Sequence, residues 1–156
     1  MSSNYKPVGG VESCSLYPAD AVQTAIFSSK GCKVQIQGTP IKVELLDDSS
    51  HYNEEIKCKD GPMKVSHQLQ LVADRKEAEK WLDTEFLERL SVEGAIAVVT
   101  LEDGRSLLVG YSSHFGDEQP LRLEYLISES GNNLHDKPIV TLQLLSYDTE
   151  FSSEIL

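Results

Sequence analysis

The run AIAVVTLEDGRSLLVGYSS at residues 95–113 decides the fold class. Its first seven residues are almost continuously apolar and rich in β-branched side chains, which is typical of a central strand buried on both faces. Asp103-Gly104 follows, and we expect the chain to turn there because glycine accepts a positive φ at no steric cost. Gly110, inside the returning strand, predicts a bulge or a close backbone approach. The sequence therefore predicts a β-hairpin within a sheet.

Seven further segments have the alternating or β-rich pattern of strands with one buried face. They cover residues 11–17, 33–37, 41–45, 51–59, 63–73, 121–127 and 139–147. Gly38-Thr39-Pro40 predicts a hairpin between the second and third segments, and Asp60-Gly61 predicts one between the fourth and fifth. Residues 19–26 are expected to form a short helical turn or a loop.

One amphipathic helix is expected at about residues 75–90, with a kink at Asp83-Thr84. Asp74 and Glu77 have the spacing of a capping box at its start. Apolar side chains then recur at helical intervals, and Trp81 lies on that stripe as the expected core anchor of the helix.

Together these patterns predict a mainly β (α+β) protein, an antiparallel β-sandwich or open barrel of about nine strands with the helix packed against it. The length of 156 residues suits one domain, 1–156. We expect residues 1–9 to form a loose lead and residues 148–156 to form a tail that can fray.

The chain is acidic, with 25 Asp plus Glu against 14 Lys plus Arg and a net charge of -11. Such a surface repels phosphates, so neither sequence-specific nucleic-acid binding nor docking on an anionic membrane is expected. The sequence has no signal-peptide pattern and no apolar run of about 18 residues that could span a bilayer. These features predict a cytoplasmic protein.

No motif in the sequence predicts a catalytic, cofactor or metal site, and we expect a non-enzymatic protein. Cys14, Cys32 and Cys58 have no ligand spacing and are expected to be thiols. The four histidines are expected at the surface, and the paired carboxylates, such as Glu54-Glu55, are expected on a solvated face. A hydrolase that uses two acids across a cleft remains a minor alternative.

The polar segment 128–137 is too long for a tight hairpin. It is predicted to be either an assembly arm that orders against a neighbouring subunit or a plain mobile loop. The residues assigned to this assembly loop are Ser130, Gly131, Asn132, Asn133, Leu134, His135 and Asp136.

Several short segments resemble those of small structural proteins encoded beside phage tail genes in Bacteroides-type bacteria. They are DGRSLLVG at 103–110, PLRLEY at 120–125, SGN at 130–132 and VTLQL at 140–144, with VGGV at 8–11 and YPAD at 17–20. The sequence departs from that pattern at 134–138, LHDKP. The resemblance implies a tail-tube-like component of a phage or prophage, with a β-sandwich or barrel core and one flanking helix. Such a subunit would assemble with itself or with other tail proteins, first in the host cytoplasm and then in the virion.

A second function stays open beside the structural one. An antiparallel barrel can hold one small ligand among its inward side chains. Tyr111, Phe115 and Tyr125 are the aromatic residues expected to line such a cavity.

Overall fold

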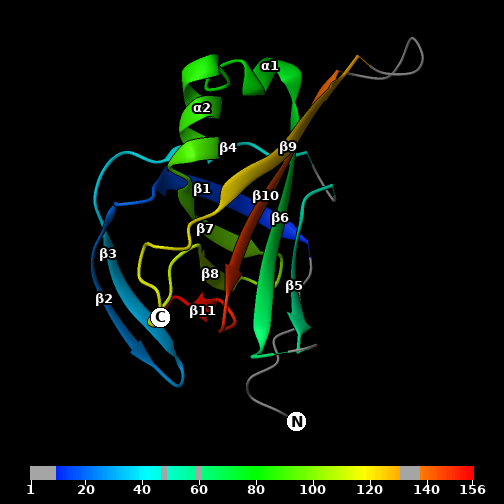
Figure 1. Cartoon of the computed structure of the whole chain (residues 1–156). Coiled ribbons are helices and arrows are strands. Elements are labelled where there is room, and N and C mark those ends of the chain that lie inside the picture. Colours follow the sequence, from blue (N-terminus) through cyan, green and yellow to red (C-terminus); the bar gives the residue numbers. More distant parts are fainter. Residues whose placement is uncertain (1–9, 47–48, 59–60, 131–137) are drawn as a thin grey trace.

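The computed structural model of the chain describes residues 10–46, 49–58, 61–130 and 138–156 (Figure 1). The described part is mostly β, with 57% of its residues in strands and 10% in helices. The strands of the described part are β1 (Val11–Pro18), β2 (Val22–Ser28), β3 (Gly31–Ile36), β4 (Ile41–Val43), β5 (His51–Lys57), β6 (Lys64–Asp74), β7 (Ala95–Leu101), β8 (Ser106–Val109), β9 (Arg122–Glu129), β10 (Ile139–Asp148) and β11 (Ser153–Glu154). The helices are α1 (Arg75–Ala78) and α2 (Thr84–Val92).

The strands form three antiparallel sheets. The five-stranded sheet has the order β11-β8-β7-β1-β4, the four-stranded sheet has the order β5-β6-β10-β9, and β2 pairs with β3 alone. The arrangement fits a β-sandwich and contains no closed barrel. The expected fold class is thus confirmed in its sandwich form.

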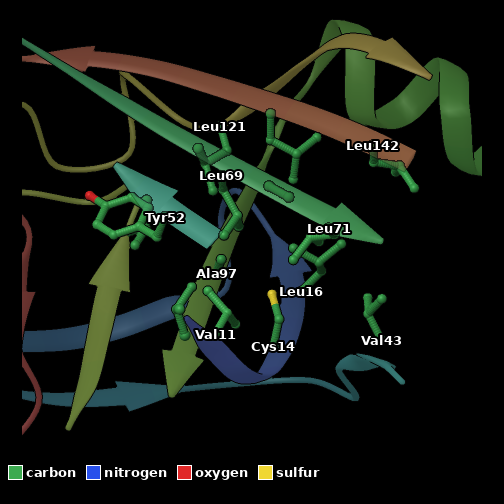
Figure 2. Packing of buried hydrophobic residues seen from close by; sticks show 14 of the residues in the cluster. Val11, Cys14, Leu16, Val43, Tyr52, Leu69, Leu71, Ala97, Leu121 and Leu142 are labelled. Atoms are coloured by element: carbon green, nitrogen blue, oxygen red, sulfur yellow. The ribbon is translucent and has the colours of Figure 1, made fainter. Parts of the chain in front are cut away.

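Strand β7 lies at the centre of the five-stranded sheet and is buried on both faces, as its apolar run predicted. Ala97 and Val99 belong to the main core, which also contains Leu71 and Leu142 of the four-stranded sheet. Figure 2 shows Ala97, Leu71 and Leu142 in this core. Ile96, on the opposite face of β7, belongs to a second core that includes side chains of the β2–β3 hairpin. Two cores require apolar residues at consecutive positions, because successive side chains of a strand point to opposite faces.

Two expected hairpins are confirmed and one is wrong. β5 pairs with β6, and β7 pairs with β8. The hairpin expected between 33–37 and 41–45 does not form, because β3 pairs with β2 and β4 pairs with β1. Residues 19–26 were expected to be a helical turn or loop, but most of them belong to β2. The structure places a turn at 29–30 instead, and the half-buried side chains of β2 help to form the second core.

The helix expected at 75–90 is divided in two in the structure, and the second part begins at Asp83-Thr84, where a kink was expected. The carboxylate of Asp83 accepts a hydrogen bond of 2.7 Å from the backbone N–H of Phe86 and so caps a new first turn. Trp81 lies between the helices rather than on one. It is half-buried against the main core, in edge-to-face contact with Phe86 at 5.4 Å between ring centroids. Both helices lie over the same end of the sandwich (Figure 1).

Candidate functional site

Four polar side chains meet inside the protein where the C-terminal segment crosses β5 and β6; we call them the polar cluster. Tyr52 and Glu54 are two residues apart on β5 and therefore lie on one face of the strand. His67 of β6 is the register partner of Glu54, and Ser152 completes the cluster. Tyr52 is 0% exposed and His67 only 4%. In Figure 2 the hydroxyl of Tyr52 points away from the leucines of the main core.

Both ring nitrogens of His67 make contacts. Nε2 lies 2.9 Å from the backbone carbonyl oxygen of Glu150, which can only accept, so Nε2 carries a proton. Nδ1 lies 2.6 Å from the Tyr52 hydroxyl and 3.2 Å from both Ser152 Oγ and Glu54 Oε2. Glu54 Oε2 accepts from the backbone N–H of Ser152 at 2.7 Å and lies 3.0 Å from its Oγ. The hydroxyls of Tyr52 and Ser152 are in direct contact.

The cluster fixes the charge state of two of its members. Burial acts to raise the pKa of Glu54, but hydrogen bonds with His67 and Ser152 outweigh it and hold that pKa below its ordinary value of 4.5. Burial, reinforced by the charge of Glu54, raises the pKa of Tyr52 well above 10.0. At neutral pH Glu54 is therefore a carboxylate and Tyr52 a neutral phenol.

Ser, His and Glu are the residue types of a catalytic triad, but their hydrogen bonds here differ from those of a triad. In a catalytic triad the serine contacts one ring nitrogen of the histidine and the acid contacts the other. Ser152 and Glu54 instead share Nδ1, and Nε2 is taken by a backbone carbonyl. The cavity beside His67 measures about 10 Å³, roughly the space of one water molecule. The geometry of the polar cluster is that of a clamp on the C-terminal segment.

Residues 149–156, which we call the C-terminal clasp, are bonded to all three sheets. Ser152 is held by β5 and β6 of the four-stranded sheet. Strand β11 pairs with β8 of the five-stranded sheet, and the N–H of Ile155 donates to the Ser106 carbonyl at 2.8 Å. The N–H of Leu156 donates to the carbonyl of Cys32 in β3 at 2.9 Å. This differs from the expectation of a frayed tail at 148–156, because partners distant in the chain supply the bonds.

Tyr52→Phe is expected to lower the free energy of unfolding by about 1–3 kcal/mol, because it leaves His67 and Ser152 without a buried hydroxyl partner. Urea denaturation measures the loss. Tyr125→Phe is the matched control, because Tyr125 is 39% exposed on β9 and its hydroxyl is absent from the cluster. Equal effects of the two changes would contradict the clamp.

The sequence did not identify the polar cluster. His67 and Glu54 were expected at the surface, and both expectations are wrong, whereas His51 and His114 are exposed. His135 lies outside the described residues. The signal that could have found the site is the alternation within β5, which places Glu54 on the same face as the buried Tyr52.

The residues assigned to the assembly loop and to a ligand cavity are not brought together. Ser130 is exposed directly after β9, whereas Gly131, Asn132, Asn133, Leu134, His135 and Asp136 lie outside the described residues. Tyr111 stacks on Phe27 in the second core, and Tyr125 is exposed on β9. Phe115 lines an open groove of about 540 Å³ beside Met63 and Tyr147.

Other features of the described residues add no second site. Cys14 and Cys32 are buried, Cys58 is exposed, and burial raises the pKa of Cys14 to about 12. Across 10–46, 49–58, 61–130 and 138–156, no group of three or more His, Cys, Asp or Glu side chains could hold a metal ion. Neither described helix is long and apolar enough to cross a membrane. Comparison with protein-family models, with curated proteins and with solved structures finds no match to this chain.

Proposed function

We propose that the chain is a non-enzymatic structural subunit that assembles with further copies of itself, and that strand β9 is the assembling edge. The resemblance of short segments, among them 103–110 and 120–125, to phage tail proteins supports a place in a phage or prophage tail. The observation that carries the proposal is that β9, an end strand of the four-stranded sheet, exposes two large apolar side chains.

β9 is an eight-residue end strand whose only sheet neighbour in the described part is β10. An end strand presents unpaired backbone groups that can pair with another chain. Tyr125 is 39% exposed and Ile127 is 46% exposed, and they lie two residues apart on the same face. Both end strands expose charged side chains, but β9 exposes two large apolar side chains on one face, whereas the opposite end strand, β5, exposes one, Ile56. These differences favour β9 over β5.

Two copies of β9 are self-complementary. In an antiparallel pair centred on Leu126, Tyr125 of each copy lies opposite Ile127 of the other. Such cross-strand pairs of an aromatic and a β-branched residue stabilise sheets by about 0.2–1 kcal/mol each. The contact uses the same surface on both copies, as in most soluble dimers.

Ile127→Lys is expected to weaken self-association about tenfold or more, because a buried Ile contributes about 1.5–3 kcal/mol and the Lys adds like charges across the two-fold contact. Sedimentation equilibrium of the full chain measures the effect. Each copy carries a net charge of -11, so added salt is expected to strengthen association by screening their repulsion.

Ile26→Lys is the matched control, because Ile26 is 69% exposed on β2, in a different sheet. It is expected to leave association unchanged. A wild-type chain that stays monomeric at high concentration and high salt, or an equal effect of Ile26→Lys, would overturn the proposal.

A further inference from the structure

The polar cluster contains more close contacts between polar atoms than its two hydroxyl protons can bridge with hydrogen bonds. A path of three contacts runs from His67 Nδ1 to the Tyr52 hydroxyl, then to Ser152 Oγ, and then to Glu54 Oε2. Each contact needs one proton, and the two hydroxyls supply two. A third proton, on Nδ1 or on the carboxyl group at the other end of the path, would allow all three contacts to be hydrogen bonds at once.

The direct contact between His67 and Glu54 favours Nδ1 as the site of this third proton. A neutral ring already has its proton on Nε2, so its Nδ1 lone pair would face a Glu54 oxygen at 3.2 Å. The pKa of Glu54 is held below its ordinary value, so the carboxyl does not carry the proton at neutral pH. A proton on Nδ1 would make the pair an imidazolium and a carboxylate. Both side chains are almost fully enclosed, with 6% and 5% of their surfaces exposed.

Other titratable groups surround His67 without replacing Glu54. They are Tyr52 on β5, Tyr111 after β8, Asp148 at the end of β10, and Glu150 in the clasp. The Asp148 carboxylate accepts from the backbone N–H groups of residues 149 and 150 at 2.6 Å and 3.2 Å. The Glu150 carboxylate accepts from Ser113 Oγ at 2.9 Å. Both acids are thus directed to other donors.

We propose that the C-terminal clasp is a proton-dependent latch, closed when His67 carries a proton on both ring nitrogens and loosened when Nδ1 loses it. Histidine is the side chain that ordinarily changes charge between about pH 5 and 8, so a change across neutral pH can operate such a latch. Loss of the proton leaves a buried carboxylate facing a lone pair, and the contacts that hold Ser152 weaken.

Opening of the latch has a defined structural result. When β11 leaves, β8 becomes the outer strand of the five-stranded sheet. The carbonyls of Ser106 and Cys32 lose the N–H donors that the clasp supplies. The polar cluster is remote from β9 in the four-stranded sheet, with β5 and β9 as opposite end strands, so this inference does not depend on the proposed self-association.

Hydrogen exchange of the full chain at about pH 6 and about pH 8, corrected for intrinsic rates, tests the latch. If opening of the clasp releases one proton, its opening equilibrium constant changes by up to about tenfold per pH unit. We therefore expect the amides of Ile155 and Leu156 to lose protection at the higher pH by up to about a hundredfold, while β10 keeps its protection. Equal protection of the clasp at both pH values would overturn the proposal, and so would a loss shared by all strands.

His67→Gln is expected to open the clasp at both pH values, whereas His114→Gln, at an exposed histidine outside the cluster, is expected to behave as the wild type. An unaltered exchange profile in His67→Gln would contradict the latch. If this variant does not fold, nitrogen NMR of histidine-labelled wild type decides. Two protonated ring nitrogens on His67 at about pH 6 support the latch, and an unprotonated Nδ1 there overturns it.

Discussion

Gly110→Ala is expected to lower the free energy of unfolding by about 2–5 kcal/mol, one of the two largest effects that we predict. Gly110 has φ +92°, a left-handed conformation that costs other residues about 1–2 kcal/mol. An added Cβ would also lie 2.9 Å from the carbonyl oxygen of Ala95 and 3.1 Å from the backbone nitrogen of Leu121. Ala95 and Leu121 exchange two backbone hydrogen bonds that join β7 to the start of β9, so the clash falls on a junction between the two large sheets.

Gly104→Ala is a closely matched control, because Gly104 has the same φ of +92° but no atom within 4 Å of an added Cβ. It is expected to cost only the conformational part, about 1–2 kcal/mol. Urea denaturation of both variants separates conformation from contact. Equal losses would show that the close approach at Gly110 contributes nothing.

The hairpin at 95–113 and the close approach at Gly110 could be predicted because the information is local. A continuous apolar run and Asp-Gly at a turn each indicate one local structure, and a glycine inside a strand indicates a bulge or a close backbone approach. Strand β2 was missed for the opposite reason. Its pattern over 22–28 is weak, and its partner β3 was instead assigned to a hairpin with 41–45. Competition between two possible partners of one strand is decided by packing, here by the second core.

The polar cluster could not be predicted because its contacts are non-local. Glu54 and Ser152 are 98 residues apart in sequence, and His67 and Ser152 are 85 apart. An acidic residue in a polar strand is expected to be exposed to solvent. Only the fold shows the hydrogen-bond partners that offset the cost of burying its charge. The divided helix is a smaller case of the same limit, because Asp83 can lie within a helix or begin one.

Glu54→Gln is expected to lower the free energy of unfolding by about 3–5 kcal/mol at neutral pH, because it removes a buried carboxylate that accepts from Ser152 and contacts His67. The effect should depend on pH in a defined direction. The folded-state pKa of Glu54 lies below its ordinary value of 4.5, so the stabilisation that comes from ionising this carboxyl group is fully present from about pH 4.5 up to the pH at which the proposed latch loosens. That contribution is lost as the pH falls through the lower folded-state pKa. Denaturation of wild type and variant from neutral to acidic pH should therefore show two curves that converge in acid.

Glu55→Gln controls for a general effect of charge, since Glu55 is the next residue on β5 and its side chain is 55% exposed. Its ion pair with Lys57, at 3.5 Å, lies at the surface, and its loss is expected to cost less than about 1 kcal/mol at every pH. Adjacent residues of the same type then differ only in the face of the strand that they occupy. A gap between wild type and Glu54→Gln that persists unchanged in acid would mean that the carboxylate charge does not stabilise the cluster. If the difference in unfolding free energy from wild type disappears in acid for Glu54→Gln and stays small at every pH for Glu55→Gln, the acid sensitivity of the fold comes from Glu54.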